Sequence, residues 1–267
     1  MHRLRRCLPL LGLIVAVAPA VASAQYFGRN KVQYRTFDFR VLKTPHFDIY
    51  FYPEEADGAH AAARLAERWY TRLSTLLGHE LQARQPIVLY ASGNDFRQTT
   101  VIEDFLGEGV GGVTEAARQR VVLPLTGSLA EFDHVLGHEL VHAFQYDISG
   151  LGRSGRAIGR GAEQLAATPL WFIEGMAEYL SLGPVDPATA MWLRDAALNN
   201  NLPTIEQLAR DPRFFPYRFG HALWAYIGGR YGDAVIGQIL RLVGQGFPYP
   251  EAMRRLLNVS LDQLSRE

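Results

Sequence analysis

Cysteine is almost absent from this chain, and its scarcity restricts how the protein can be stabilised. The single cysteine among 267 residues is Cys7, which lies before an apolar run at the N-terminus. A chain that loses this terminus has no thiol and therefore no disulfide. Such a protein depends on its core or on a bound metal, and 48% hydrophobic residues suffice for a sizeable core.

Long apolar runs and a strong net charge are missing as well. The apolar run from Leu8 to Val21 follows three arginines and precedes Ala22-Ser23-Ala24, a small-x-small pattern that signal peptidases cut. The run is short for a membrane span, so we predict a signal peptide at 1–24, cut after Ala24. The mature protein is then secreted or periplasmic, with no stable membrane span. Without the three arginines, 24 basic residues stand against 27 acidic ones, which does not favour nucleic acid as a partner.

No internal repeat is visible, and the hydrophobic pattern changes once along the chain. Alternating apolar residues predict two strands within 36–53, joined by a Lys-Thr-Pro turn, and a third strand at 86–91. Between them, 59–78 has the period of an amphipathic helix ending at Gly78. Glycines separate two strand-like pieces within 108–127, and helical patterns then dominate.

These patterns predict an α+β fold made of one domain in two lobes. The small N-terminal lobe, 25–127, contains a mixed β-sheet with helices. The C-terminal lobe, 128–267, is mainly helical.

The segment "HELVHAFQYD", 138–147, lies near the start of this helical lobe. Ser128 stands three residues before Glu131, the spacing of a capping box, so we predict a helix from Ser128 to about Tyr146. On that helix, His138 and His142 are one turn apart on the same face, where two imidazoles can reach one ion at about 2.0–2.1 Å.

Two further side chains of this helix have separate expected roles. Glu139 lies about 100° round the helix from His138, close enough to act on a water held by an ion without being a ligand. His134 belongs to the same stripe as the two histidines. Because a catalytic zinc normally takes three protein ligands, we interpret His134 as a packing residue or as one that supports a ligand.

A second helix supplies a candidate third ligand. The segment "TPLWFIEGMAEYLS", 168–181, starts with Thr168 as a candidate cap and carries Glu174 and Glu178 on one face. We predict Glu174 as the oxygen ligand and Glu178 as a carboxylate that orients a ligating imidazole. A solvated acidic face is the alternative, but apolar residues surround both glutamates, and unpaired carboxylates are unfavourable there.

The two segments "HELVHAFQ" and "LWFIEGMAEYL" together resemble the gluzincin metallopeptidases, and most of all their compact secreted peptidase MA-like domains. This resemblance is specific over 134–181. It implies a thermolysin-like catalytic architecture and one zinc ion held by His138, His142 and Glu174. It also implies that Glu139 is the general base.

The resemblance extends to an oxyanion partner and a substrate ledge. Tyr217, at the start of a predicted helix within 215–233, matches a tyrosine that hydrogen-bonds the reacting carbonyl in aminopeptidase N-type members; His221 and Tyr226 are the competing candidates. The segment "QRVVLPL", 119–125, is predicted to be the edge strand that pairs with the substrate backbone.

The sequence thus predicts a secreted zinc metallopeptidase whose partner is a peptide or protein substrate. Aminopeptidase N-type members hold the free amine with Gly-x-Met-Glu-Asn, and "GGVTEAARQ" lacks that pattern, which favours an endopeptidase. An aminopeptidase that uses Glu115 instead remains open, as does a catalytically silent zinc module that binds peptides or envelope partners.

The insert between the two motif helices and the C-terminal end of the chain are the two remaining features. The glycine-rich insert 147–167, which carries Arg153, Arg156 and Arg160, is interpreted as a lid, a subsite wall or a plain loop. The resemblance also allows a further domain after residue 267.

Overall fold

The computed structural model describes residues 33–102, 106–107, 109–152 and 159–267, so the predicted signal peptide lies outside the described residues. A five-stranded mixed sheet with the order β1-β2-β3-β5-β4 forms the first part of the fold. Its strands are β1 (Arg40–Lys43), β2 (Phe47–Phe51), β3 (Gln85–Tyr90), β4 (Val113–Glu115) and β5 (Arg120–Pro124). The pairs β2–β3 and β3–β5 are parallel, and the outer pairs β1–β2 and β4–β5 are antiparallel.

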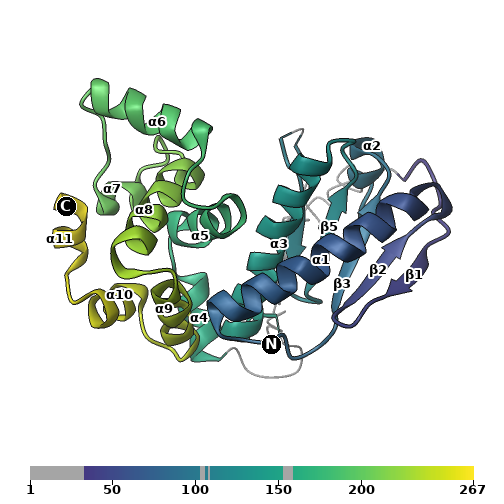
Figure 1. Ribbon diagram of the computed structural model, residues 1–267, viewed down its shortest axis with the longest axis horizontal. Coiled ribbons are helices and arrows are strands. Elements are labelled where there is room, and N and C mark those ends of the chain that lie inside the picture. The colour runs from purple at the N-terminus through teal and green to yellow at the C-terminus, as the bar shows by residue number, and fades with distance from the viewer. Residues whose placement is uncertain (1–32, 103–105, 108, 153–158) are drawn as a thin grey trace, which may run out of the picture. The chain divides into compact units, whose positions relative to one another are not determined.

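The long helix α1 (Ala56–Leu77) lies across one face of this sheet (Figure 1). Its buried face is rich in alanine, which lets the helix axis approach the strands closely. Phe47 and Ile49 of β2 are fully buried beneath it, while Asp48 between them and Tyr50 after them are only partly buried. The alternation follows from the two-residue period of a strand. The predicted end of the helix is confirmed, since Gly78 adopts the left-handed conformation that ends it.

Helices make up nearly all of the chain after the sheet, as predicted for this part of an α+β fold. They are α3 (Leu129–Ser149), α4 (Arg160–Ala166), α5 (Leu170–Leu182), α6 (Pro187–Leu198), α7 (Ile205–Arg210), α8 (Pro216–Tyr231), α9 (Ala234–Gly244), α10 (Tyr249–Leu257) and α11 (Leu261–Arg266). Two short elements precede them, η1 (Pro53–Glu55) and α2 (Gly93–Phe96). One core cluster joins the two parts, running from Ile49 in the sheet through Leu140 of α3 to Trp224 of α8.

Helices α5 and α8 cross at two glycines, and this crossing positions the candidate site. A Cβ added at Gly175 would lie 2.4 Å from the carbonyl carbon of Gly220, and one added at Gly220 would lie 2.4 Å from the carbonyl oxygen of Trp171. The two backbones therefore touch where only glycine fits. The contact brings Glu174, next to Gly175, beside Tyr217 in the first turn of α8.

Two sequence predictions need correction. The segment 119–125 is not an edge strand, because β5 lies between β3 and β4, and the edge is β4. Three consecutive residues of β5 are fully buried, as is typical of an interior strand covered on both faces. Thr168 is not the cap of α5 either: its hydroxyl donates to Leu165 O of α4, and Pro169 is the cap residue.

No helix within the described residues is both long enough and apolar enough to span a membrane.

Candidate metal centre

Helix α3 presents the His-Glu-x-x-His segment from inside the protein. Ser128 caps the helix as predicted, since its hydroxyl accepts a hydrogen bond from Glu131 N at 3.3 Å. The middle of the helix is buried all round, and His138, Glu139 and His142 are all in the buried stretch. A buried helix surface that carries polar side chains must provide a partner for each of them.

Helix α5 brings Glu174 to the two histidines. The Nε2 atoms of His138 and His142 lie 3.2 Å apart, and Glu174 Oε2 lies 3.2 Å from each of them. Ligands held at about 2.0–2.1 Å from one tetrahedral ion are themselves about 3.3 Å apart. The three atoms therefore have the spacing that a single small ion requires.

The hydrogen bonds on the far side of the imidazoles set their tautomers. Gln145 donates from Nε2 to Ile173 O at 3.0 Å, so its Oε1 accepts from His142 Nδ1 at 2.8 Å. His138 Nδ1 lies 3.0 Å from Glu178 Oε1, which is close enough for Nδ1 to donate its proton in a hydrogen bond. In the neutral form of both rings the Nδ1 atoms hold the protons, and the two Nε2 lone pairs face a carboxylate oxygen. Three electron-rich atoms this close repel one another unless a cation or a proton lies among them.

The pKa shifts of His138 and Glu174 also indicate that positive charge is favoured at this site. Burial lowers the pKa of His138, but the contacts with Glu174 and Glu178 outweigh it and raise the pKa to about 10. For Glu174, burial raises the pKa, and the contacts with His138 and His142 outweigh burial and hold it well below the usual range. The donor set thus favours an added proton when no metal is bound.

Glu178 connects His138 to a second layer of charged groups. Its Oε1 atom lies 3.4 Å from His134 Nε2, and its Oε2 atom accepts from Arg218 at 3.1 Å. Arg218 also contacts Asp186 at 3.3 Å. Burial raises the pKa of Glu178, but the close contacts with His134 and His138 outweigh it and lower the pKa well below the usual range. Glu178 therefore stays ionised and can accept a hydrogen bond from His138 Nδ1.

Two sets of side chains in the described residues could hold a metal, and they share His138. One consists of His138, His142 and Glu174; the other consists of His134, His138 and Glu178. The guanidinium of Arg218 is already bound to Glu178, so its charge opposes a cation in the second set. Within the described residues, Glu174 makes no ion pair with an arginine or a lysine. Two imidazoles and one carboxylate form a donor set that zinc and several other divalent metals accept.

Glu139 lies beside the set without joining it. The hydroxyl of Thr114, on the edge strand β4, lies 2.6 Å from Glu139 Oε2 and 2.9 Å from Glu139 O. The chain before β4 passes close to the helix, since a Cβ added at Gly112 would lie 2.9 Å from Glu139 Cγ. The glycine pair at 111–112 therefore lets the edge strand approach the motif helix, and Thr114 then orients the Glu139 carboxylate.

Three residues were predicted as candidates for the oxyanion partner. Within the described residues, only Tyr217 contacts the site. Its ring is stacked on that of His138, with centroids 6.0 Å apart and planes 11° from parallel. Burial first, and Glu174 second, raise the pKa of its hydroxyl above the usual range. His221 is instead buried between Thr189 Oγ1 and Gly183 O, each at 2.8 Å. Tyr226 donates to Glu267 at 3.1 Å.

Sequence reasoning missed four residues that support the site: Thr114, Gln145, Tyr146 and Arg218. Only Gln145 and Tyr146 left a local signal, because they follow His142 by three and four positions on the same helix. The Tyr146 ring stacks on that of His142, with centroids 6.2 Å apart. Burial and the charges of Glu139 and Glu174 raise the pKa of Tyr146 to about 12. The hydroxyl therefore stays protonated at neutral pH.

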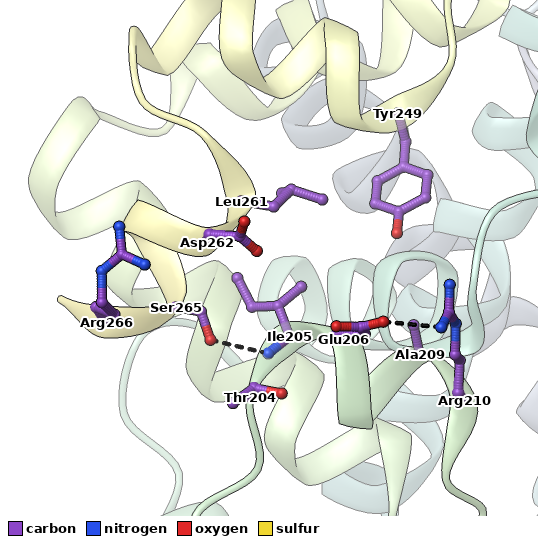
Figure 2. Close-up of a pocket in the computed structure, with 10 residues that line it drawn as sticks. All are labelled: Thr204, Ile205, Glu206, Ala209, Arg210, Tyr249, Leu261, Asp262, Ser265 and Arg266. Carbon is purple, nitrogen blue, oxygen red and sulfur yellow. Dashed lines mark hydrogen bonds and ion pairs between the residues drawn. The ribbon is translucent and has the colours of Figure 1, made fainter.

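A cavity of about 410 Å³ opens beside this cluster. Its lining includes His138, Glu139, Glu178, Tyr217 and the glycine-rich stretch 109–112. A larger cavity of about 500 Å³ lies between α7, α10 and α11, and Figure 2 shows its residues. None of the candidate ligands lines it, and its Glu206 is neutralised by exposed Arg210 at 2.7 Å. Of these two cavities, the smaller one is therefore the candidate for binding a substrate.

The insert 147–167 is only partly a loop. Its second half forms α4, which begins at Arg160, while Arg153 and Arg156 lie outside the described residues. Whether the insert acts as a lid or a subsite wall stays a prediction.

Comparison with protein-family models gives no match to this chain, and comparison with curated proteins gives none either. The assignment of the site therefore depends on its own geometry.

Proposed function

We propose that the protein is a secreted zinc-dependent peptidase whose ion is bound by His138, His142 and Glu174. The observation that carries the proposal is the convergence of two Nε2 lone pairs and one carboxylate oxygen at 3.2 Å from one another. The resemblance to the gluzincins agrees with this donor set. When bound, zinc polarises a carbonyl and lowers the pKa of water.

The residues around the ligands have roles that suit peptide hydrolysis. Glu139 would take a proton from the attacking water and deliver it to the departing amine. Thr114 holds its carboxylate at 2.6 Å. Tyr217 would donate a hydrogen bond to the developing oxyanion; the stacking of its ring on His138 and the raised pKa that keeps its hydroxyl protonated support this role.

The substrate backbone is proposed to pair with the free edge of β4. Within the described part of the chain this strand pairs only with β5, and its Thr114 contacts Glu139. An edge strand offers unpaired N–H and C=O groups to an extended peptide. A peptide bound there would pass directly beside the general base.

Internal cleavage is the favoured mode. Glu115, the residue considered for binding a free amine, accepts hydrogen bonds from Arg120 Nε and Arg118 N, both at 3.0 Å. Its charge is thus already neutralised within the β4–β5 hairpin. Glu115 is therefore not free to neutralise the α-amino group of a substrate, as an aminopeptidase would require.

The mode of cleavage is tested with a peptide that is either acetylated or free at its N-terminus. We expect both forms to be cut at the same internal bond, at rates within about threefold of each other. The reason is that Glu115 is already paired with Arg120 and is not free to bind the N-terminal amine. Mass spectrometry of the products reads out the bond. Stepwise removal of residues from the free form alone would show an aminopeptidase.

The metal and the activity are tested together on the mature protein. We expect about one zinc per chain by elemental analysis, cleavage of an unfolded protein substrate, and loss of cleavage with a chelator. A protein that retains no zinc after reconstitution would refute the centre. One zinc without any cleavage would favour the peptide-binding module instead. N-terminal sequencing of the exported protein checks the predicted cut after Ala24.

A further inference from the structure

Two large aromatic rings are exposed next to the candidate site. Trp192 of α6 is 41% exposed, and Phe215, the residue before α8, is also 41% exposed. Their ring centroids lie 5.5 Å apart. The other edge of Trp192 packs perpendicular to the buried ring of Phe219 at 6.3 Å, which holds the indole in place. The exposed face is therefore fixed before any ligand arrives.

These rings continue into the candidate metal centre. Phe215 stacks on Tyr217 at 5.1 Å, and Tyr217 stacks on His138 at 6.0 Å. Phe215 and Tyr217 both line the 410 Å³ cavity that contains His138 and Glu139. A line of aromatic rings thus leads from an exposed tryptophan to a candidate ligand.

The rings lie within the reach of a short extended peptide. The three ring-to-ring steps are 5.5, 5.1 and 6.0 Å. A strand advances roughly 3.3 Å per residue, so Trp192 lies within about five extended residues of His138. A peptide with its reacting bond near Glu139 can therefore place one of its own side chains on the exposed rings.

We propose that Trp192 and Phe215 form a binding site for an apolar side chain, aromatic by preference, of an extended peptide substrate, within about five residues of the cleaved bond. The inference rests on the proposed peptidase function and adds a specificity determinant to it. Exposed rings fixed by packing lose little entropy when they bind another ring. The continuity of the rings with the site cavity identifies the occupant as the substrate itself.

Tryptophan fluorescence tests the contact without requiring turnover. The other three tryptophans, Trp69, Trp171 and Trp224, are buried, so collisional quenching by acrylamide reports mainly on Trp192. The full chain with Glu139→Gln is titrated with acetylated peptides in which one phenylalanine is moved stepwise along a serine-alanine sequence. We expect one placement of phenylalanine to protect the fluorescence and to bind roughly three- to tenfold more tightly than the peptide without phenylalanine.

Variants then assign the effect to the ring. In anisotropy titrations with labelled peptide, Trp192→Ala should abolish the advantage of phenylalanine, and Trp192→Phe should retain part of it. Leu198→Ala is the matched control, because Leu198 lies on the same helix and is 76% exposed. It should bind both peptides as the wild-type chain does. Equal binding of every peptide, or an advantage of phenylalanine that survives in Trp192→Ala, overturns the inference.

Cleavage by the wild-type chain provides an independent arm. We expect the favoured placement of phenylalanine to raise kcat/KM and the Trp192→Ala variant to lose that preference, with cleavage still blocked by a chelator. A preference unchanged in Trp192→Ala overturns the aromatic site and leaves the peptidase proposal standing. If no peptide is cleaved by any variant, the peptidase proposal fails, and the binding titrations still decide the aromatic site.

Discussion

The proposed roles of Glu174 as a metal ligand and Glu178 as the acceptor that orients His138 can be tested by removing each carboxylate. The two glutamates lie one turn apart on α5, yet they face opposite nitrogens of His138: Glu174 Oε2 is 3.2 Å from Nε2, and Glu178 Oε1 is 3.0 Å from Nδ1. If the ion binds on the Nε2 side, Glu174→Ala deletes a ligand, whereas Glu178→Ala deletes only the acceptor that orients a ligand.

The magnitudes follow from these contacts. Glu178→Ala leaves His138 Nδ1–H buried without its acceptor, and we expect zinc affinity to fall about 10- to 100-fold, or roughly 1.4 to 2.8 kcal/mol. Glu178→Gln keeps an oxygen that can accept this proton, so the loss should be under about tenfold. Glu174→Ala leaves two protein ligands, and we expect affinity to fall by more than about 1,000-fold.

Competition with a chromophoric chelator measures these affinities, and circular dichroism verifies that each variant is folded. The two histidines that differ between the candidate sets give a second comparison: His142→Ala should lose zinc, while His134→Ala should keep it within about tenfold. Weaker binding by Glu178→Ala than by Glu174→Ala, or by His134→Ala than by His142→Ala, would move the ion to the other set and refute the assignment.

Three further perturbations have defined outcomes. Glu139→Gln should retain zinc by elemental analysis while peptide cleavage falls by at least about 100-fold, because the carboxylate acts on the proton and not on the ion; equal loss of metal would make it a ligand. Gly175→Ala should lower the free energy of unfolding by about 1–3 kcal/mol, because its Cβ would lie 2.4 Å from the Gly220 backbone. Gly229→Ala is the control and should not lower it, because its Cβ has no neighbour within 4 Å. Similar losses in both variants would contradict the close crossing. Burial raises the pKa of Glu55 to about 7, so the native state holds a proton there that the unfolded chain releases above its own pKa of 4.5, and stability falls as pH rises from about 4.5 to about 7. Glu55→Gln should remove that part of the decline in thermal melts between pH 5 and 8, and parallel profiles for the two proteins would exclude it.

The secondary structure around the site could be predicted because its signals are local. A cap at Ser128, a period of 3.6 residues and histidines four apart are properties of neighbouring residues, and they define α3 and its face without further contacts. The same holds for α1 and for the change from strands to helices, which gave the α+β class. The strand order was not predictable in this way, because the apolar run in β5 could be assigned to a strand but not to a place in the sheet.

The partners of the site had no comparable signal. Arg218 reaches Glu178 across 40 positions and Thr114 reaches Glu139 across 25, and neither pair shares a helix or a strand. The crossing of α5 and α8 at Gly175 and Gly220 sets which side chains surround the ligands, and a glycine in a sequence does not reveal which backbone it touches.

The sequence by itself thus determined that His138, Glu139 and His142 lie around one turn of a helix, because helical spacing alone places them there. Only the tertiary structure decided how Glu174 meets both imidazoles, which carboxylate lies beside His138 Nδ1, and which strand of the described sheet forms the edge beside Glu139. The physical reason is that hydrogen bonds and repulsion between charges depend on distances of about 3 Å through space, and such distances are set by the packing of whole helices and not by positions along the chain.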